Sequence, residues 1–333
     1  MKRMFSRIAV AFTAGLILFF CITGCNKTEN PIKYQYGTFP DSVYNLTGLN
    51  TQYDDYNSTC LLLGSVLNII FSSNRESSGG QYDLVQGRIG FTFDQTNGYF
   101  TLESQMSNDP FFEALINKAN TDGNDFGPYA VFSSSDGYEY FLVASQAPAG
   151  DLDLYYLRYL PYFGSIPPIA GPYPITKINS SDDDAYIAFN INRDSVYFCS
   201  DRDGDFDIYV QDKDIESYMD LWFNDSFEAA AAVDSVNSDY NDKCPFINGN
   251  LMVFASDRPG GLGGFDLYYS ILRNGKWGSP VNFGPGINSS SDEYRPLFDS
   301  HPDFTNAFML FSSNRPGGDG GYDLYLTGFS LDK

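Results

Sequence analysis

Apolar and polar positions along the chain repeat one β-hairpin pattern five times. The clearest copy spans residues 251–268, where an apolar run ends in Ala-Ser-Asp-Arg, a Gly- and Pro-rich turn follows, and a second apolar run begins at Phe265. Short apolar runs bounded by Gly and Pro are typical of paired β-strands. The other four copies lie at residues 69–84, 142–155, 196–209 and 308–325.

The spacing of the copies predicts the fold. The Asp that opens the second strand of each hairpin marks its copy, and these markers are Asp83, Asp153, Asp207, Asp266 and Asp323. Successive markers are 70, 54, 59 and 57 residues apart. This period is too long for a solenoid of helical hairpins and suits one four-stranded propeller blade with its connectors. We therefore expect an all-β, five-bladed β-propeller with four antiparallel strands per blade.

The repeated phrase resembles a known repeat. The pattern F-[AS]-S-[DN]-R-x-G-G-x-x-x-Y-D-[LI]-Y is similar to the TolB-like, WD-repeat-like β-propeller motif, and the resemblance covers nearly all of residues 43–333. The second copy departs from it, because Gln146 and Ala147 stand where the others have Asp or Asn followed by Arg. The resemblance implies a propeller but says little about function, since propellers carry out many unrelated functions.

The two ends of the repeat region predict how the ring closes. After Asp323 the chain stops one strand short of a full blade, and the missing phrase stands at residues 43–46, which match residues 281–283. We expect this N-terminal strand to complete the last blade, because closure leaves few exposed sheet edges. Residues 42–333 would then form a single propeller domain.

The connectors between hairpins carry a second recurring phrase, Asn followed by Ser or Thr and by acidic residues. We expect these connectors and the Arg-containing turns on the same face of the propeller. Their repeated Asp and Arg residues are expected to tie neighbouring blades together. Asp109 followed by Pro110 predicts the start of a short helix, and the Ala-rich residues 226–233 predict another.

The N-terminus has the pattern of an export signal. Residues 1–24 combine three basic residues with an apolar run at residues 8–22, which is short for a membrane span. The run ends in Ile-Thr-Gly-Cys25, which resembles a bacterial lipobox and implies that Cys25 carries lipid. By the same resemblance, Asn26 favours the outer membrane. We thus expect a lipid-anchored envelope protein with a linker at residues 25–41, held to the membrane through its lipid only.

Charge and cysteine content limit the possible partners. Removing the signal takes away three basic residues and no acidic one, so the net charge changes from −22 to −25. So acidic a chain is unsuited to nucleic acid and suits divalent cations or basic partners, although solubility alone also explains the charge. Cys60, Cys199 and Cys244 lie within apolar runs and are expected as small buried hydrophobic residues, with at most one disulfide among them.

Few catalytic chemistries fit the sequence. His301 is the only His, no nucleophile elbow accompanies it, and the Gly pairs lack the Lys-Ser/Thr of a phosphate loop. A pair of channel carboxylates, as in five-bladed glycosidases, remains possible. Asp201, Asp203 and Asp205 alternate as in a calcium loop and are candidate calcium ligands, although hydrogen bonds within a tight turn also explain them. No cofactor is required.

The irregular connectors around the second repeat offer the candidate binding residues. Their aromatic side chains either lie exposed as contact sites for a protein or a glycan or pack against the blade edge. These residues are Phe111, Phe112, Tyr159, Tyr162, Phe163 and Tyr173. The sequence therefore favours a non-catalytic binding or scaffold module of the cell envelope. The alternative is a carbohydrate hydrolase, which would need two carboxylates about 5–10 Å apart in an open channel.

Overall fold

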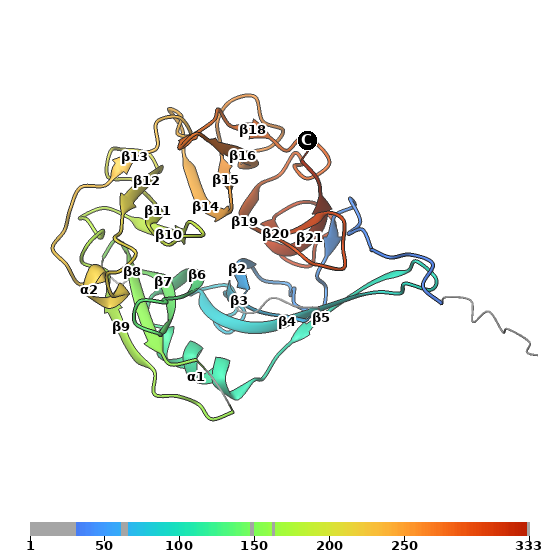
Figure 1. Ribbon diagram of the computed structural model, residues 1–333, viewed down its shortest axis with the longest axis horizontal. Helices are drawn as coiled ribbons and strands as arrows, with labels where there is room; N and C mark the ends of the chain where they lie inside the picture. The colour runs from blue at the N-terminus through green and yellow to red at the C-terminus, as the bar shows by residue number, and fades with distance from the viewer. Residues whose placement is uncertain (1–30, 61–65, 147–149, 162–163, 332–333) are drawn as a thin grey trace, which may run out of the picture.

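Five β-sheets surround a central channel in the computed structural model, which describes residues 31–60, 66–146, 150–161 and 164–331 (Figure 1). Each sheet follows the chain from the channel outward through antiparallel neighbours. The predicted all-β, five-bladed propeller with four strands per blade is confirmed. The blades arise because each hairpin buries apolar residues on both faces, against the blade before it and the blade after it.

The strands are numbered along the chain, and each blade is given from its innermost to its outermost strand. Blade 1 contains β2 (Asp55–Cys60), β3 (Val66–Ser73), β4 (Asp83–Phe93) and β5 (Phe100–Met106). Blade 2 contains β6 (Asn124–Phe132), β7 (Glu139–Gln146), β8 (Leu152–Tyr159) and β9 (Ala170–Pro174). Blade 3 contains β10 (Asp184–Phe189), β11 (Ser195–Ser200), β12 (Asp207–Asp212) and β13 (Ala231–Ala232).

The last two blades follow the same order. Blade 4 contains β14 (Asp242–Asn248), β15 (Leu251–Ser256), β16 (Asp266–Arg273) and β17 (Lys276–Trp277), and β18 (Val281–Asn282) also pairs with β16. Blade 5 contains β19 (Glu293–Ser300), β20 (Ala307–Ser313), β21 (Asp323–Phe329) and the N-terminal β1 (Tyr44–Asn45).

Closure of the ring by the N-terminal strand is confirmed. Tyr44 and Asn45 of β1 pair antiparallel with Leu326 and Tyr325 of β21. The contact extends upstream of β1, where Phe39 is fully buried and stacks on Phe304 with ring centroids 3.9 Å apart. The segment before residue 42, which the sequence suggested was a linker, therefore already packs on the propeller in its last residues.

One of the two predicted helices is present. Helix α1 (Pro110–Ala119) begins as expected, because the Asp109 carboxylate accepts hydrogen bonds from the backbone N–H groups of Phe111 and Phe112. The prediction of a helix at residues 226–233 is wrong. The helix in this connector is α2 (Met219–Phe223), and the Ala-rich segment is extended because Ala231 and Ala232 pair with β12. Neither helix of the described chain is long and apolar enough to cross a membrane.

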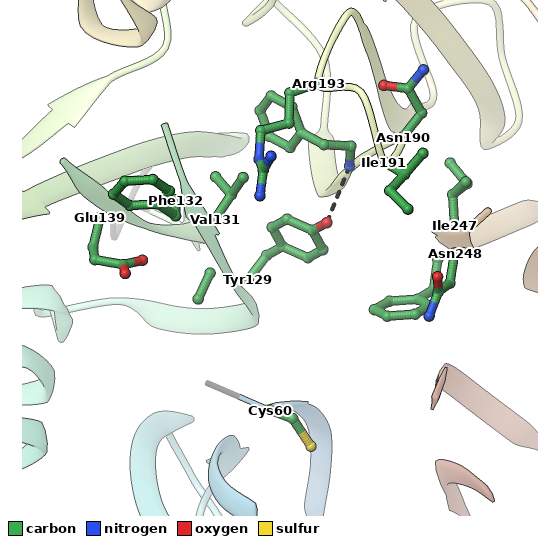
Figure 2. A pocket seen from close by; sticks show the side chains of 13 residues that line it. Cys60, Tyr129, Val131, Phe132, Glu139, Asn190, Ile191, Arg193, Ile247 and Asn248 are labelled. Carbon is green, nitrogen blue, oxygen red and sulfur yellow. Dashed lines mark hydrogen bonds between the residues drawn. The ribbon is translucent and has the colours of Figure 1, made fainter. Parts of the chain in front are cut away.

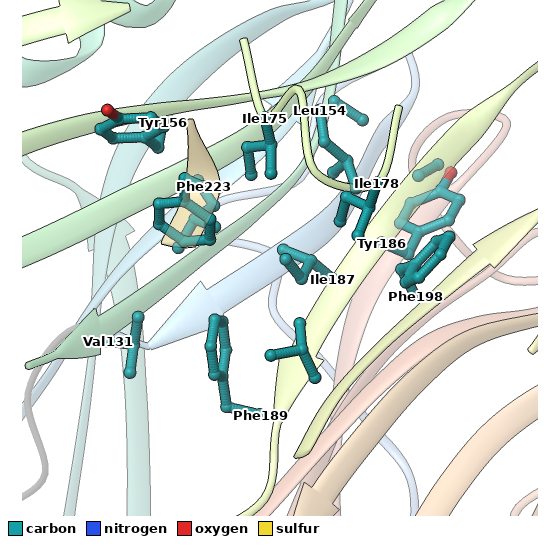
Figure 3. Packing of buried hydrophobic residues seen from close by; sticks show 14 of the residues in the cluster. Val131, Leu154, Tyr156, Ile175, Ile178, Tyr186, Ile187, Phe189, Phe198 and Phe223 are labelled. Atoms are coloured by element: carbon teal, nitrogen blue, oxygen red, sulfur yellow. The ribbon is translucent and has the colours of Figure 1, made fainter. Parts of the chain in front are cut away.

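The largest core cluster lies between blades 2 and 3 (Figure 3). It joins Leu154 and Val131 of blade 2 to Ile187 and Phe198 of blade 3. The three cysteines of the described residues are free thiols. As expected of small apolar residues, Cys199 and Cys244 are buried, and Cys60 is partly buried.

Candidate active site

The repeated acidic residue at the start of each inner strand is buried and held by its own blade. In four blades it forms an ion pair with the Arg of the next turn in the same blade. These pairs are Asp55–Arg75, Asp184–Arg202, Asp242–Arg258 and Glu293–Arg315. The expectation that repeated Asp and Arg residues join neighbouring blades is therefore wrong for these ion pairs. It holds for acidic residues of the connectors, since Asp54 accepts a hydrogen bond from the backbone N–H of Tyr322 in blade 5 and Asp292 accepts one from that of Phe265 in blade 4, both at 2.9 Å. The Arg also donates to a backbone carbonyl of the preceding connector, as Arg75 does to Leu49, and so fixes the connector and the turn on one face.

A further hydrogen-bonded link between neighbouring blades comes from the Asn of each connector. Asn50 donates to the carbonyl of Leu324 at 3.0 Å and accepts from its backbone N–H at 2.8 Å, which links blade 1 to blade 5. The same pair of hydrogen bonds, one donated and one accepted by the side-chain amide, recurs at Asn120, Asn179, Asn237 and Asn288. A side-chain amide can do this because it carries both a donor and an acceptor, whereas a carboxylate only accepts.

Blade 2 lacks the Arg, and Asp125 is left with hydroxyl and backbone partners. Its carboxylate accepts hydrogen bonds from Ser145 and from the backbone N–H and hydroxyl of Thr121. Burial raises the pKa of Asp125 to about 6. Because all five acidic residues are at most 1% exposed, we exclude them as a carboxylate pair that reaches substrate.

A second set of five residues blocks the middle of the channel. In every blade, the pairing of the innermost strand with its neighbour shifts in register. A residue with positive φ, between 48° and 59°, lies within each shift. We call these residues the channel plug: Asn57, Gly127, Tyr186, Cys244 and Arg295. Their contacts cross the ring, since Asn57 of blade 1 donates to the Tyr186 hydroxyl of blade 3 at 3.3 Å. Arg295 of blade 5 likewise donates to the Pro128 carbonyl of blade 2 at 3.0 Å.

Beyond the plug, a pocket of ≈ 400 Å³ opens where the inner strands end, on the face opposite the Arg turns (Figure 2). We call it the channel pocket. Four polar side chains and several aromatic ones line it, and those used below are Glu139, Asn190, Arg193, Asn248, Tyr129 and Phe246. This size and this mixture of aromatic surface with a few polar groups are typical of small-molecule sites.

One carboxyl group lines the pocket, and a second is hydrogen-bonded to a residue that lines it. Glu139, at the start of β7, lines one side, and Figure 2 shows Asn248 on the opposite side. Asn248 donates to Asp299 of β19 at 3.2 Å, and the Ser300 backbone N–H donates to the same oxygen at 2.7 Å. Burial raises the pKa of both carboxyls, while the Arg193 charge lowers that of Glu139 and the hydrogen bonds lower that of Asp299. Blades 2 and 5, which carry them, are not neighbours in the ring.

Comparison with solved structures identifies glycoside hydrolases as similar folds. An endo-arabinase from Bacteroides thetaiotaomicron has a TM-score of 0.53 and 11% identity, with 89% of this chain and 99% of that chain covered. An α-L-arabinofuranosidase from Podospora anserina gives 0.53 and 11%, with 90% and 97% covered. A thermostable family-43 glycoside hydrolase gives 0.51 and 12%, with 87% and 94% covered. No protein-family model matches the sequence, and no curated protein is significantly similar to it.

These likenesses correct the expectation drawn from the sequence. At such low identity they show a shared fold, and the three similar structures named above are glycoside hydrolases, not TolB-like proteins. The expectation of a non-catalytic scaffold, and of a chain that is not an enzyme, is contradicted, and the alternative of a carbohydrate hydrolase is favoured. The repeat phrase does not distinguish these functions, because it encodes blade construction, which propellers of different function share.

Most of the predicted aromatic contact residues that can be placed are buried. Phe111, Phe112 and Tyr159 are 5%, 7% and 5% exposed and pack together in one core cluster. For these three rings, the structure favours the packing alternative over a contact surface. Tyr173 is 43% exposed. Tyr162 and Phe163 lie outside the described residues.

The predicted calcium turn makes hydrogen bonds within the protein. The Asp201 carboxylate accepts from the Asp183 backbone N–H at 2.8 Å, and Asp203 accepts from the Tyr209 hydroxyl at 2.6 Å. Across the described ranges, no three acidic, His or Cys side chains gather as metal ligands. Calcium binding at Asp201, Asp203 and Asp205 stays a prediction that this arrangement does not support. The signal at residues 1–24 and the lipid site at Cys25 lie outside the described residues.

Sequence reasoning missed the residues of the channel pocket. Glu139, Arg193 and Asp299 occupy positions outside the repeated phrase, so no pattern marks them. The channel plug does carry a signal, because each of its members stands two residues after the repeated acidic residue. Arg295 is the only charged residue among the five plug residues, so blade 5 differs from the other four blades at this position.

Proposed function

We propose that this protein is a glycoside hydrolase whose active site is the channel pocket. The observation that carries the proposal is a pocket at the mouth of a propeller channel that Glu139 lines, with Asp299 of a non-adjacent blade hydrogen-bonded to Asn248 in the pocket wall. Paired carboxyl groups are the usual machinery for cleaving a glycosidic bond. The hydrolase function of the proteins with a similar fold supports the same reaction class.

Glu139 is assigned as the general acid. It has no hydrogen-bond partner among the described residues, and burial disfavours its ionised form, so it retains a proton to higher pH than an ordinary Glu. It would donate this proton to the departing glycosidic oxygen. The positive charge of Arg193 opposes this rise in pKa and thereby favours release of the proton to the departing oxygen.

Asp299 is assigned as the ionised partner. Burial raises the pKa of Asp299, and the hydrogen bonds from the Ser300 backbone and from Asn248 oppose this rise, because they stabilise the negative charge and fix the orientation of the carboxylate. It would act either as a base on water or as a nucleophile on the sugar carbon. In the pocket, Tyr129 and Phe246 provide aromatic surface for a sugar ring, and Asn190 and Asn248 can bond its hydroxyls.

The test begins with the mature chain and a panel of aryl glycosides and polysaccharides. Arabinan is included because two proteins of similar fold are named for arabinose-containing substrates. We expect Glu139→Gln and Asp299→Asn each to lower kcat/KM by about 10²–10⁴-fold. Glu216→Gln and Asp239→Asn are matched controls, since both residues are exposed on the surface, and they should retain full activity.

Two further readouts separate chemistry from folding. The melting temperatures of Glu139→Gln and Asp299→Asn should stay close to that of the wild type. The anomeric product, followed by NMR, reports the geometry: retention requires carboxyls about 5–5.5 Å apart and inversion about 6.5–9.5 Å. A wild-type protein without activity on any member of the panel, or full activity in both variants, would refute the proposal.

A further inference from the structure

Arg295 is a buried cation that lacks a carboxylate partner. It is 2% exposed and forms no ion pair with any described residue, whereas the Arg of the turn pairs with a buried acid in four blades. Its Nη2 donates to the backbone carbonyls of Pro128 at 3.0 Å and Gly127 at 3.4 Å. Carbonyl oxygens orient the guanidinium but carry no net charge to balance it.

The other groups around Arg295 are neutral at physiological pH. The guanidinium lies 5.4 Å from the centre of the Tyr186 ring. Its charge also acts on Tyr129, Cys199 and Cys244, yet burial raises the pKa of each of these groups, that of Cys244 to about 11. None of them supplies a negative charge. An uncompensated buried charge is strongly destabilising, so a counterion is needed.

Three buried polar atoms in the same part of the channel lack a hydrogen-bond partner among the described residues. They are Nη1 of Arg295, the Ser58 hydroxyl and Oδ1 of Asn57. Asn57 and Arg295 both contact Tyr186, while Ser58 follows Asn57 on β2. Nη1 of Arg295 and the Ser58 hydroxyl are donors, whereas Oδ1 of Asn57 is an acceptor. Buried polar atoms normally have partners, so three unpaired ones indicate a missing ligand.

We propose that the channel plug binds one small inorganic anion of the size of chloride at Nη1 of Arg295. An anion supplies both the missing charge and the acceptor that these donors require. A water molecule would satisfy the hydrogen bonds but leave the charge unbalanced. The ligand is small because Arg295, Asn57 and Ser58 are each at most 2% exposed. This site is separate from the channel pocket and does not depend on the proposed hydrolase activity.

The first experiment measures melting temperature while chloride replaces gluconate at constant ionic strength. Gluconate is too large for the buried site, so only chloride binds the folded state and stabilises it. We expect the wild-type melting temperature to rise by about 5 °C at a hundredfold excess over the dissociation constant. Equal melting in the two salts would overturn the proposal.

Variants locate the effect. Arg295→Met should lose the chloride response, whereas Arg273→Met, which removes an exposed Arg, should keep it in full. Ser58→Ala should raise the chloride concentration at half effect by about tenfold, because one donor to the anion is lost. An unchanged response in both Arg295→Met and Ser58→Ala would place the anion elsewhere and refute the assignment.

Diffraction keeps the test decisive even if Arg295→Met does not fold. Wild-type crystals soaked in bromide should show an anomalous peak within hydrogen-bond distance of Nη1 of Arg295. A peak without anomalous signal at this position would identify water and overturn the proposal.

Discussion

The N-terminal segment should contribute a large part of the stability of the propeller. A chain that begins at Asp54 lacks β1 and three almost fully buried side chains, those of Phe39, Leu46 and Leu49. Each buried side chain of this kind stabilises a fold by about 1.5–3 kcal/mol, so the three together contribute roughly 5–9 kcal/mol. The free energy of unfolding of a folded protein is about 5–15 kcal/mol. The shortened chain should therefore be largely unfolded or melt far below the mature protein.

Thermal unfolding followed by circular dichroism measures this effect. The control is a chain that begins at Tyr36, which keeps Phe39 and β1 and should melt within a few degrees of the mature protein. A finer comparison uses Phe39→Ala, whose ring stacks on Phe304 at 3.9 Å, and Tyr36→Ala, whose ring is 51% exposed. The first should cost about 3–5 kcal/mol and lower the melting temperature by roughly 6–15 °C, and the second should change it little.

The reasoning fails if the chain that begins at Asp54 melts together with the mature protein. It also fails if Phe39→Ala and Tyr36→Ala have equal effects. Either result would mean that β21 is stable as an outer strand and that ring closure contributes little.

Three further predictions follow from the blades. Arg258→Met should lower the free energy of unfolding in urea by about 3–5 kcal/mol, because it leaves the Asp242 carboxylate buried without its cation. The pKa of Asp125 is about 6 in the folded protein, which is higher than in the unfolded chain, so the stability contributed by the protonated carboxyl is lost as the pH rises from about 4 to 6. Asp125→Asn should therefore flatten the fall in melting temperature over this range. Gly127→Ala should destabilise the fold, because the added Cβ would lie 2.5 Å from the Tyr186 ring at a φ of +55°, and unchanged melting would contradict the plug geometry.

The architecture could be predicted from the sequence because it depends on short-range patterns. Each blade repeats the same strand, turn and strand, so five copies of the phrase predict five blades. The N-terminal match to residues 281–283 predicted β1, and Asp109 before Pro110 predicted α1, since a cap and a missing strand are both local signals. Helix propensity gave the wrong prediction at residues 226–233, because pairing of Ala231 and Ala232 with β12 outweighed the preference of Ala for a helix.

The interior of the ring was decided by the tertiary structure alone. Glu139 and Asp299 are 160 positions apart in the sequence, and only closure of the ring brings Glu139 into the channel pocket and Asp299 next to Asn248 in its wall. The positive φ of the plug residues turns Tyr186 and Arg295 across the channel, and no local pattern encodes a contact between non-adjacent blades. Burial of Phe111 likewise depends on how α1 packs against blade 2. Repeats specify how a blade is built, whereas the chemistry of the channel depends on side chains that meet only when five blades close around it.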